Sequence, residues 1–172
     1  LIMAGGRGER FWPLSTSKHP KQVLKIFSGK PMLAMAVDYL RGIVPPERIF
    51  IITSASLAKI TRKAVPSVPP GNIIGEPFGR DTAAVCALGS ALVTARDPEG
   101  VLCVLTADHM ISDLSLFRKT LSECFRTAEA KDVLITMGMK PDSPNTAFGY
   151  IESGEKQSAR SGVEFCKVKR FV

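Results

Sequence analysis

The sequence has few residues of the kinds that build zinc sites or disulfide frameworks. It contains two histidines and four cysteines among 172 residues. No CxxC pair occurs, and no spacing of His and Cys supports a zinc site. Most of the cysteines lie inside apolar runs, so we expect buried thiols in a reducing compartment. The four are Cys86, Cys103, Cys124 and Cys166.

Long hydrophobic runs are also missing. No apolar stretch is long enough to cross a bilayer, and no charged-then-apolar leader precedes the first motif. We therefore expect a soluble, cytoplasmic protein without a membrane partner. Acidic residues are in the minority, 16 against 23 basic residues, which gives a formal net charge of +7. That surplus suits an anionic partner, whether nucleic acid, lipid or a phosphorylated metabolite, and charge alone does not choose among them.

The composition, 45% hydrophobic and 23% charged, is that of an ordinary globular domain and excludes a disordered or fibrous chain. The sequence opens without a methionine start, on a segment that resembles the second half of a buried strand, and it stops within a strand-like pattern. We therefore expect residues 1–172 to form one domain that is incomplete at its C-terminal end and slightly so at its N-terminal end.

Short aliphatic runs alternate with segments of helical period. Strands are predicted at the very start of the chain and over 49–53, 101–105 and 133–137, with helices over 81–96 and 113–128. The segment 65–71 is predicted to be a loop, and two strands around a polar turn are expected beyond residue 139. This alternation is typical of βαβ units. We predict an α/β fold, a Rossmann-like three-layer sandwich with a mostly parallel central sheet.

A glycine-rich turn follows the first strand, in the sequence AGGRGER. Glycines let backbone N–H groups approach phosphate oxygens closely, because no Cβ stands in the way. A Walker A loop would need Gly-Lys-Ser/Thr at its end, and the dinucleotide fingerprint would need a third glycine where Phe11 stands. We interpret Ala4, Gly5, Gly6 and Gly8 as a phosphate-binding turn. The alternative is that these glycines only form a tight turn.

Two cations follow the turn closely. Arg10 and Lys21 are separated by FWPLSTSKHP, whose prolines and hydroxyl residues favour a loop that folds back over the same site. The planar Arg fork suits bidentate phosphate contacts, and Lys acts as a point charge. The alternative is that both are solvated surface cations, which is how we interpret Lys18, Lys25 and Lys30.

Asp108 follows the predicted strand VLCVL, in the sequence LTADH. Ligands of open α/β folds bind at the carboxyl edge of the sheet, where this carboxylate is expected. Mg²⁺ prefers one or two carboxylates together with phosphate oxygens, so Asp108 is the candidate metal ligand. The alternative for Asp108 is a helix cap. We interpret the neighbouring His109 as a structural imidazole.

The segment GEPFGRDTAA delivers Asp81 and Thr82 to the start of a predicted helix. Backbone amides at a helix N-terminus can recognise an anion or a base edge. A plain N-cap role for Asp81 is an equally serious alternative.

Taken together, GGRGERFWPLS, HPKQ, GEPFGRDTAA and LTADH resemble the signature set of the sugar nucleotidyltransferases. They are most similar to the mannose-1-phosphate guanylyltransferase branch, which Trp12 and the EPxGR pattern favour. The motifs occur in the family's order and spread over nearly the whole chain.

The resemblance implies an enzyme that transfers GMP from GTP to mannose 1-phosphate, giving GDP-mannose and pyrophosphate, with Mg²⁺ as cofactor. By resemblance, the glycine turn would wrap the nucleotide, Arg10 would contact the triphosphate, Lys21 would stabilise charge at the α-phosphate and Asp108 would hold Mg²⁺. Gly149 and Tyr150 stand where the family begins to enclose the sugar. The residues implied to contact base and ribose are Glu76, Pro77, Gly79, Arg80, Asp81, Thr82 and Ala83.

The chain departs from the family pattern at several positions. Asp81 stands where family members usually have Asn, Ala84 where they have Pro, and NTAFGYI where TGYGYI is common. Base and sugar identity are therefore open, and another sugar 1-phosphate or nucleotide is an alternative. The family continues past VKRFV with a sugar-binding Glu and a later metal-binding Asp. A chain ending at residue 172 is expected to bind nucleotide with little or no turnover.

Two rival functions follow from the same residues. The first is a catalytically silent homologue that senses GDP-sugars, although such a sensor could lose Arg10, Lys21 or Asp108, and all three are present. The second is a basic nucleic-acid-binding domain, which would need exposed aromatics among its basic residues. Most of the nine Phe fall in apolar runs, so we expect no nucleic-acid partner. Association into a homo-oligomer is left open.

Overall fold

The structure is a computed structural model that describes residues 1–6, 12–16, 20–26, 29–79 and 81–172. The chain divides into two compact units, Leu1–Leu114 and Ser115–Val172. Among the described residues, every helix is too short or too polar to cross a membrane.

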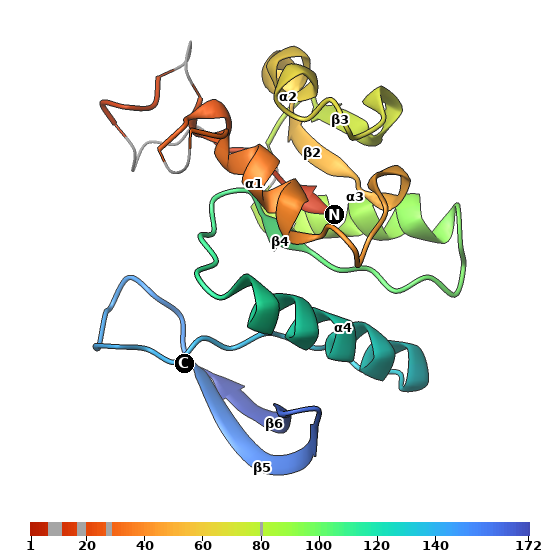
Figure 1. The fold of residues 1–172 in the computed structure, drawn as a ribbon, viewed down its shortest axis with the longest axis vertical. Helices are drawn as coiled ribbons and strands as arrows, with labels where there is room; N and C mark the ends of the chain where they lie inside the picture. The colour runs from red at the N-terminus through yellow and green to blue at the C-terminus, as the bar shows by residue number, and fades with distance from the viewer. Residues whose placement is uncertain (7–11, 17–19, 27–28, 80) are drawn as a thin grey trace. The chain divides into compact units, whose positions relative to one another are not determined.

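The first unit is built on a parallel sheet with the strand order β3-β2-β1-β4 (Figure 1). The chain therefore runs outward from the central β1 through β2 to β3 and then crosses to β4 on the other side. Ile2 pairs with Ile51 on one side and with Leu105 on the other. The strands are β1 (Ile2–Met3), β2 (Ile51–Ser54), β3 (Ile73–Glu76) and β4 (Leu105–Thr106).

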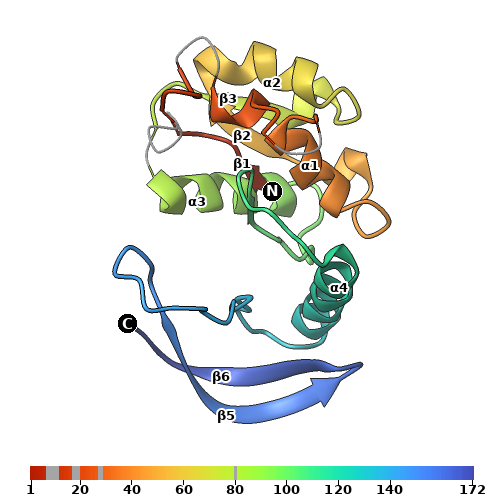
Figure 2. The same cartoon turned by 60° about the vertical axis from the view of Figure 1, so that its left-hand side comes forward.

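Helices cover both faces of this sheet. Figure 2 shows α1 (Met32–Tyr39) and α2 (Ala58–Ala64) on one side and α3 (Asp81–Thr94) on the other. The pleat sends alternate residues of a strand to opposite faces. Phe50 and Ile52 thus pack with Val85 of α3. A parallel sheet between two helical layers confirms the predicted α/β sandwich, and α3 confirms the helix predicted over 81–96.

Two details explain how such short strands are held. A Cβ on Gly75 would lie 2.7 Å from the Ala55 Cα, so only glycine lets the chain after β2 approach β3 this closely. At the amino ends of the strands, the buried Asn72 side chain donates to the carbonyls of Glu47 (2.9 Å) and Ile49 (3.0 Å). Its oxygen accepts a hydrogen bond of 2.8 Å from Arg96, just beyond α3. This network ties the ends of β2, β3 and α3 together.

Two strand predictions need correction. The strand predicted over 101–105 is confined to Leu105–Thr106. Residues 133–137 form no strand, and the Leu134 side chain is fully exposed. Strand propensity reflects packing and pairing with neighbouring strands rather than a local backbone preference. Among the described residues the sheet ends at β4, and segment 133–137 pairs with none of its strands.

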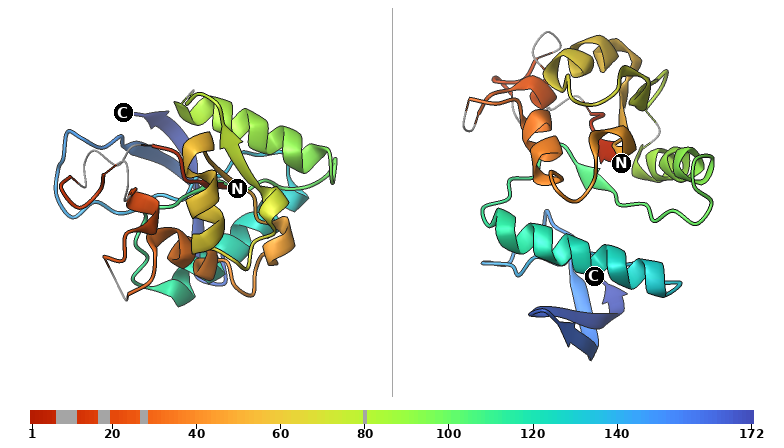
Figure 3. Two further views of the ribbon diagram at one scale, coloured as in Figure 1. Left: turned by 90° about the horizontal axis from the view of Figure 1, so that it is seen from above. Right: turned by 45° about the vertical axis from the view of Figure 1, so that its right-hand side comes forward.

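The second unit contains α4 (Leu114–Ala130), from Ser115 onward, and a hairpin of β5 (Ile151–Arg160) and β6 (Val163–Phe171). Both the helix and the hairpin were expected from the sequence. The two strands run side by side in Figure 3 and are joined by Ser161 and Gly162, with φ values of 53° and 79°. Positive φ at both central residues is the type I′ geometry that suits the twist of a hairpin.

Opposite charges face each other across the hairpin, where Lys169 binds Glu152 at 2.5 Å and Lys156 pairs with Glu164. Such cross-strand pairs stabilise a sheet. None of the four cysteines forms a disulfide, but the expectation that they are buried is wrong for Cys166, which is exposed on β6. The other three are half-buried.

Candidate functional site

Three of the predicted segments leave the sheet at the same edge. β1 runs into Gly5, β3 ends at Glu76, and β4 leads to Asp108. Because the strands are parallel, their carboxyl ends meet at one edge, and ligands of open α/β sheets bind there. The glycine turn, the GEPFGRD segment and the LTADH segment are therefore neighbours in space, as the sequence predicted.

The glycine turn begins where its sequence predicted. Gly6 has a φ of 100°, a backbone conformation that glycine adopts without strain and other residues rarely adopt. A Cβ at Gly6 would meet no atom of the described residues within 4 Å. The buried Thr53 hydroxyl donates to the Ala4 carbonyl at 3.0 Å and fixes the end of β1 just before the turn. Gly8 and Arg10 lie outside the described residues.

Glu76, at the end of β3, lies next to the glycine turn. Its Oε2 atom lies 3.8 Å from the position that a Cβ on Gly5 would occupy. The Glu76 side chain is half-buried at the end of β3. A carboxylate at this point can accept hydrogen bonds from a ligand that lies along the turn.

Lys21 and Asp108 meet directly. The Lys21 Nζ donates to the Asp108 Oδ2 at 2.5 Å, although the two residues are 87 positions apart in the sequence. Their side chains are 18% and 30% exposed, so the ion pair is only partly accessible to water. Burial alone would raise the pKa of Asp108, but the hydrogen bond and charge of Lys21 hold it below its ordinary value of 3.8. The sequence placed both groups at one site but did not predict that they bind each other.

The main chain on both sides of this pair is held by hydrogen bonds. Lys21 begins a short 3₁₀ helix (Lys21–Val23), and the N–H of Leu24 donates to the Lys21 carbonyl at 3.1 Å. Ahead of Asp108, the N–H of Ala107 donates to the Met3 carbonyl at 3.1 Å. Since α4 begins only at Leu114, directly after Asp113, the alternative that Asp108 caps this helix is wrong. The charged side chains therefore project from a fixed backbone.

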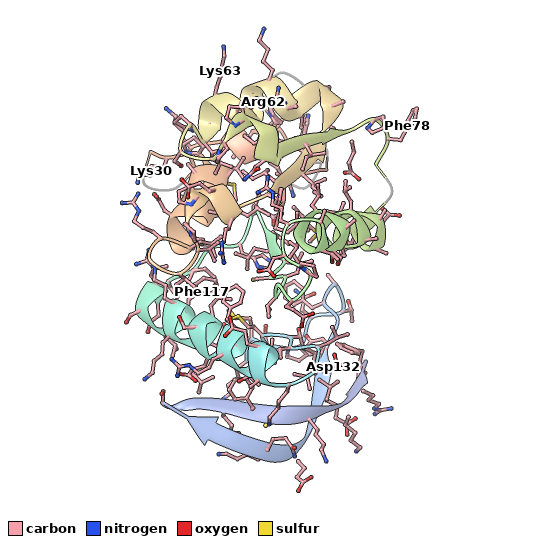
Figure 4. The ribbon with its side chains drawn as sticks, turned by 90° about the vertical axis from the view of Figure 1, so that its right-hand side faces the viewer. Lys30, Arg62, Lys63, Phe78, Phe117 and Asp132 are labelled. Carbon is pink, nitrogen blue, oxygen red and sulfur yellow. The ribbon has the colours of Figure 1, made fainter. Side chains whose placement is uncertain are left out.

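The loop between β3 and α3 is open to solvent. Pro77 and Gly79 are exposed, and Figure 4 shows Phe78 extending outward from this loop, with 73% of its surface accessible. Arg80 lies outside the described residues. Asp81 is the first residue of α3 and has a φ of 60°, in the left-handed region, and Thr82 and Ala83 follow it, exposed, in the first helical turn. Asp81 thus lies at the N-terminus of α3. Both a role in ligand binding and a role as a plain helix cap require this position.

The two predicted sugar-binding residues belong to the second unit. Tyr150 is half-buried, and its hydroxyl accepts a hydrogen bond of 2.7 Å from the Asn145 N–H and donates to the Asn145 carbonyl at 3.1 Å. Together with the loop 141–146, Tyr150 lines an open pocket of about 460 Å³. Gly149 is exposed beside it. Their role in binding a sugar stays a prediction.

At this site, water molecules or phosphate oxygens would have to supply most of the ligands of a metal ion. In the described part of the chain, no three His, Cys, Asp or Glu side chains come together in a metal-binding group. Mg²⁺ is commonly held by one or two carboxylates with substrate phosphates and water as the other ligands. Asp108 can supply one such carboxylate at the mouth of the glycine turn. The residues therefore fit Mg²⁺ shared with a polyphosphate, and they do not fit a cage built from protein groups alone.

Sequence reasoning missed two residues that position the site. Thr53 fixes the end of β1, as described above, and the Tyr39 hydroxyl accepts a 3.4 Å hydrogen bond from the Ile111 N–H, which supports the loop after Asp108. The polar residue Thr53 within the apolar sequence of β2 could have indicated its role at the end of β1. Nothing in the sequence around Tyr39 indicated the second. His109 is exposed on the same loop.

Taken together, the described residues offer a turn of glycine amides, an ammonium group and a carboxylate at one sheet edge. Backbone N–H groups and Lys bind phosphate oxygens, and a carboxylate binds the cation that accompanies them. The arrangement suits a ligand with several phosphates in a row.

Comparisons with known proteins agree with this chemistry. The family model described as nucleotidyl transferase matches residues 1–172. The chain is 37% identical over 158 residues to a putative mannose-1-phosphate guanylyltransferase from Vibrio cholerae, covering 91% of this chain and 34% of that protein. It is 34% identical over 181 residues to the mannose-1-phosphate guanylyltransferase of Escherichia coli K12, covering 100% of this chain and 36% of that protein.

A solved structure is also similar. The crystal structure of mannose-6-phosphate isomerase from Helicobacter pylori superposes with a TM-score of 0.73 and 25% sequence identity, covering 99% of this chain and 58% of that one. The two guanylyltransferases are much longer than this chain, which spans about a third of their length, at 34% and 36%.

Proposed function

This chain belongs to the nucleotidyl transferase family, and we propose that it carries the nucleotide-binding part of an enzyme that transfers GMP from GTP to mannose 1-phosphate. The products are GDP-mannose and pyrophosphate. Because the chain spans about a third of its relatives' length, at 34% and 36%, the activity of the whole protein is part of this proposal.

One observation carries the proposal. The Lys21 ammonium and the Asp108 carboxylate, from distant parts of the sequence, meet at 2.5 Å at the sheet edge where the glycine turn begins. A surface lysine and a surface aspartate would not need to share a partly buried position at the end of the sheet where the glycine turn begins. A polyphosphate with its metal ion uses all three features at once.

In the proposed reaction, a phosphate oxygen of mannose 1-phosphate attacks the α-phosphorus of GTP in line, and the bond to the leaving pyrophosphate breaks. Such transfers rely on positioning and on electrostatic stabilisation rather than on a covalent enzyme intermediate. Lys21 stabilises negative charge at the α-phosphate, the glycine turn donates N–H groups to phosphate oxygens, and Arg10 contacts the triphosphate.

The carboxylate of Asp108 would hold Mg²⁺. When bound there, the metal would neutralise charge on the phosphates and keep them oriented. Glu76, next to Gly5, would accept hydrogen bonds from the ribose or base, together with the first turn of α3.

Guanine and mannose are supported by the relatives rather than by contacts in the described residues. The names of both guanylyltransferases include mannose 1-phosphate, and that of the similar solved structure includes mannose 6-phosphate. A mannose phosphate is thus common to all three names. Gly149 and Tyr150, beside the pocket of the second unit, are the proposed sugar contacts.

The test has two steps. GTP binding is measured first by calorimetry with Mg²⁺, with ATP, UTP and dTTP as competitors, and we expect GTP to bind most tightly. Pyrophosphate release and the nucleotide-sugar product are then followed on the full-length protein with mannose 1-phosphate, glucose 1-phosphate or no sugar. We expect GDP-mannose only from the mannose reaction. GTP binding without any pyrophosphate release would favour the silent GDP-sugar sensor, and isomerisation of mannose 6-phosphate without nucleotide transfer would replace the proposal.

Substitutions test the roles of the two charged residues. Lys21→Ala and Asp108→Ala should each lower kcat by about a hundredfold or more, as the loss of a preorganised charge does in other enzymes. Lys25→Ala and Lys30→Ala remove the same charge from exposed positions and should leave kcat within about twofold, since neither is placed in the site. Near-normal turnover in either site variant would contradict its role.

A further inference from the structure

In the structure, the side chains of Lys21 and Asp108 form an ion pair with each other. The proposed reaction needs them for other partners, because Lys21 must face the α-phosphate and Asp108 must face a metal ion. The Lys21 ammonium lies 2.5 Å from the Asp108 Oδ2, which is within the space that a cation bound to this oxygen would take. The Lys21 ammonium and a metal ion therefore cannot both bind the Asp108 Oδ2 atom at the same time.

We propose that Lys21 and the divalent cation compete for Asp108, so that arrival of the metal releases Lys21 toward the phosphates of the nucleotide. This inference rests on the proposed function, because it assumes that Asp108 is the metal ligand. It adds an order to that function. Before any ligand binds, Lys21 neutralises the Asp108 carboxylate. The metal ion frees Lys21 to bind the nucleotide, and the nucleotide, by holding Lys21, frees Asp108 to bind the metal ion.

The geometry identifies the partner that moves. Asp108 follows Ala107, whose N–H is bonded to Met3 of the central strand at 3.1 Å. The main chain of Lys21 is likewise fixed by the bond from Leu24 at 3.1 Å, but its side chain is a flexible four-carbon stem. Exchange therefore requires only rotation of the Lys21 side chain. The 30% exposure of the Asp108 side chain leaves solvent, and a hydrated cation, a route to it.

The size of the effect follows from the fraction of time for which the pair is closed. When only a fraction of the protein is in the state that can bind a ligand, the apparent affinity equals the intrinsic affinity multiplied by that fraction. If Lys21 holds Asp108 for about nine-tenths of the time, the cation binds about tenfold more weakly than it would to a free carboxylate. Linkage requires reciprocity, so the nucleotide must raise metal affinity by the same factor by which metal raises nucleotide affinity.

Another ion pair in the same unit provides a matched control. Lys30 binds Asp38 at 2.8 Å, and Asp38 also binds Arg41 at 2.7 Å. Asp38 lies on α1, and its charge is compensated by two basic side chains. Lys30→Met removes a lysine–aspartate pair without freeing Asp108. Lys25→Met removes an exposed charge from the segment that carries Lys21.

The first experiment measures Mn²⁺ binding to the nucleotide-free protein through the electron paramagnetic resonance signal of the free ion. Lys21→Met should bind Mn²⁺ about tenfold more tightly than wild type. Lys25→Met and Lys30→Met should match wild type within about twofold, because both lysines are exposed and salt screens exposed charges. Adding Asp108→Asn to Lys21→Met should abolish the gain. Unchanged or weaker Mn²⁺ binding by Lys21→Met would overturn the competition, as would a gain that survives Asp108→Asn.

A second experiment leaves the side chains intact. The rate of acetylation of each lysine amine is measured by mass spectrometry with and without Mg²⁺ and a non-hydrolysable GTP analogue. Mg²⁺ alone should speed modification of Lys21 several-fold relative to Lys30, and addition of the nucleotide should protect Lys21 again. Modification of Lys21 at the same rate with and without bound metal would refute release.

These readouts separate the inference from the function on which it rests. Neither Mn²⁺ binding nor labelling by Mg²⁺ alone requires transfer of GMP. Tighter Mn²⁺ binding by Lys21→Met in a protein that forms no GDP-mannose would leave the exchange standing and remove the proposed reaction. Formation of GDP-mannose by a protein whose Mn²⁺ affinity does not depend on Lys21 would refute the exchange and leave the proposed reaction standing.

Discussion

The contact between Lys21 and Asp108 should make a measurable contribution to stability in the absence of any ligand. A double-mutant cycle with Lys21→Met, Asp108→Asn and the double variant isolates it. Fully exposed ion pairs contribute about 0.2–1 kcal/mol, and hydrogen bonds to charged groups contribute about 1.5–3 kcal/mol. With side chains 18% and 30% exposed, this pair lies between those classes. We expect a coupling energy of about 1–2 kcal/mol in metal-free buffer at neutral pH.

The coupling should disappear in acid, and its sign is fixed by the direction of the pKa shift. Burial raises the pKa of Asp108, but the Lys21 interaction and further hydrogen bonds to the carboxylate together bring it below its ordinary value of 3.8 in the folded protein. A carboxyl whose pKa is lowered by folding contributes stability above its unfolded pKa and loses it as the pH falls through the folded pKa. The coupling energy should therefore be constant near neutrality and decline below pH 3.8.

The assay is urea unfolding of the four proteins followed by circular dichroism, with EDTA present to remove metal ions. The equivalent cycle on Lys30 and Asp38 is the control, because that lysine is 59% exposed and its coupling should stay below about 1 kcal/mol. A Lys21–Asp108 coupling no larger than the control, or one that persists unchanged in acid, would refute the geometry from which the site is argued.

Two further predictions concern the scaffold. Asn72→Ala removes a buried amide that donates to two carbonyls and accepts from Arg96, so the free energy of unfolding should fall by about 2–3 kcal/mol; a loss below about 0.5 kcal/mol in urea titration would show that the network contributes little. Asp81 has a φ of 60°, where a side chain costs about 1 kcal/mol or more and glycine does not. Asp81→Gly should therefore unfold at a higher temperature than Asp81→Ala, and the opposite order, which is usual within helices, would exclude the left-handed conformation.

Local patterns in the sequence were sufficient for α3 and α4, the two longest helices among the described residues. The apolar spacing after Asp113 gave α4, and the segment from Asp81 gave α3. By contrast, β3 has only two isoleucines, between a Pro-rich loop and the GEP turn, and was not predicted. Its existence depends on pairing with β2, which no local pattern reports. The opposite error occurred at 133–137, where strand-forming residues lie outside the sheet.

The candidate site shows the same division. Motif chemistry and the rule for parallel sheets predicted that the glycine turn and Asp108 share one site, whereas Glu76 was implied only by the resemblance to the family. The direct bond between Lys21 and Asp108 could not be predicted, because it depends on how the long segment after β1 returns to the sheet. The support from Thr53 and Tyr39 was missed for a similar reason, since each hydroxyl binds a backbone group far away in the sequence.

The most direct test of the account is a crystal structure of the protein with Mn²⁺ and a non-hydrolysable GTP analogue, with the metal located by its anomalous scattering. We expect one Mn²⁺ peak beside Asp108 that also contacts phosphate oxygens, the phosphates along Gly5 and Gly6, and the Lys21 ammonium moved from Asp108 to the α-phosphate. A nucleotide bound away from this edge, or the Lys21–Asp108 pair intact beside a bound nucleotide, would contradict it.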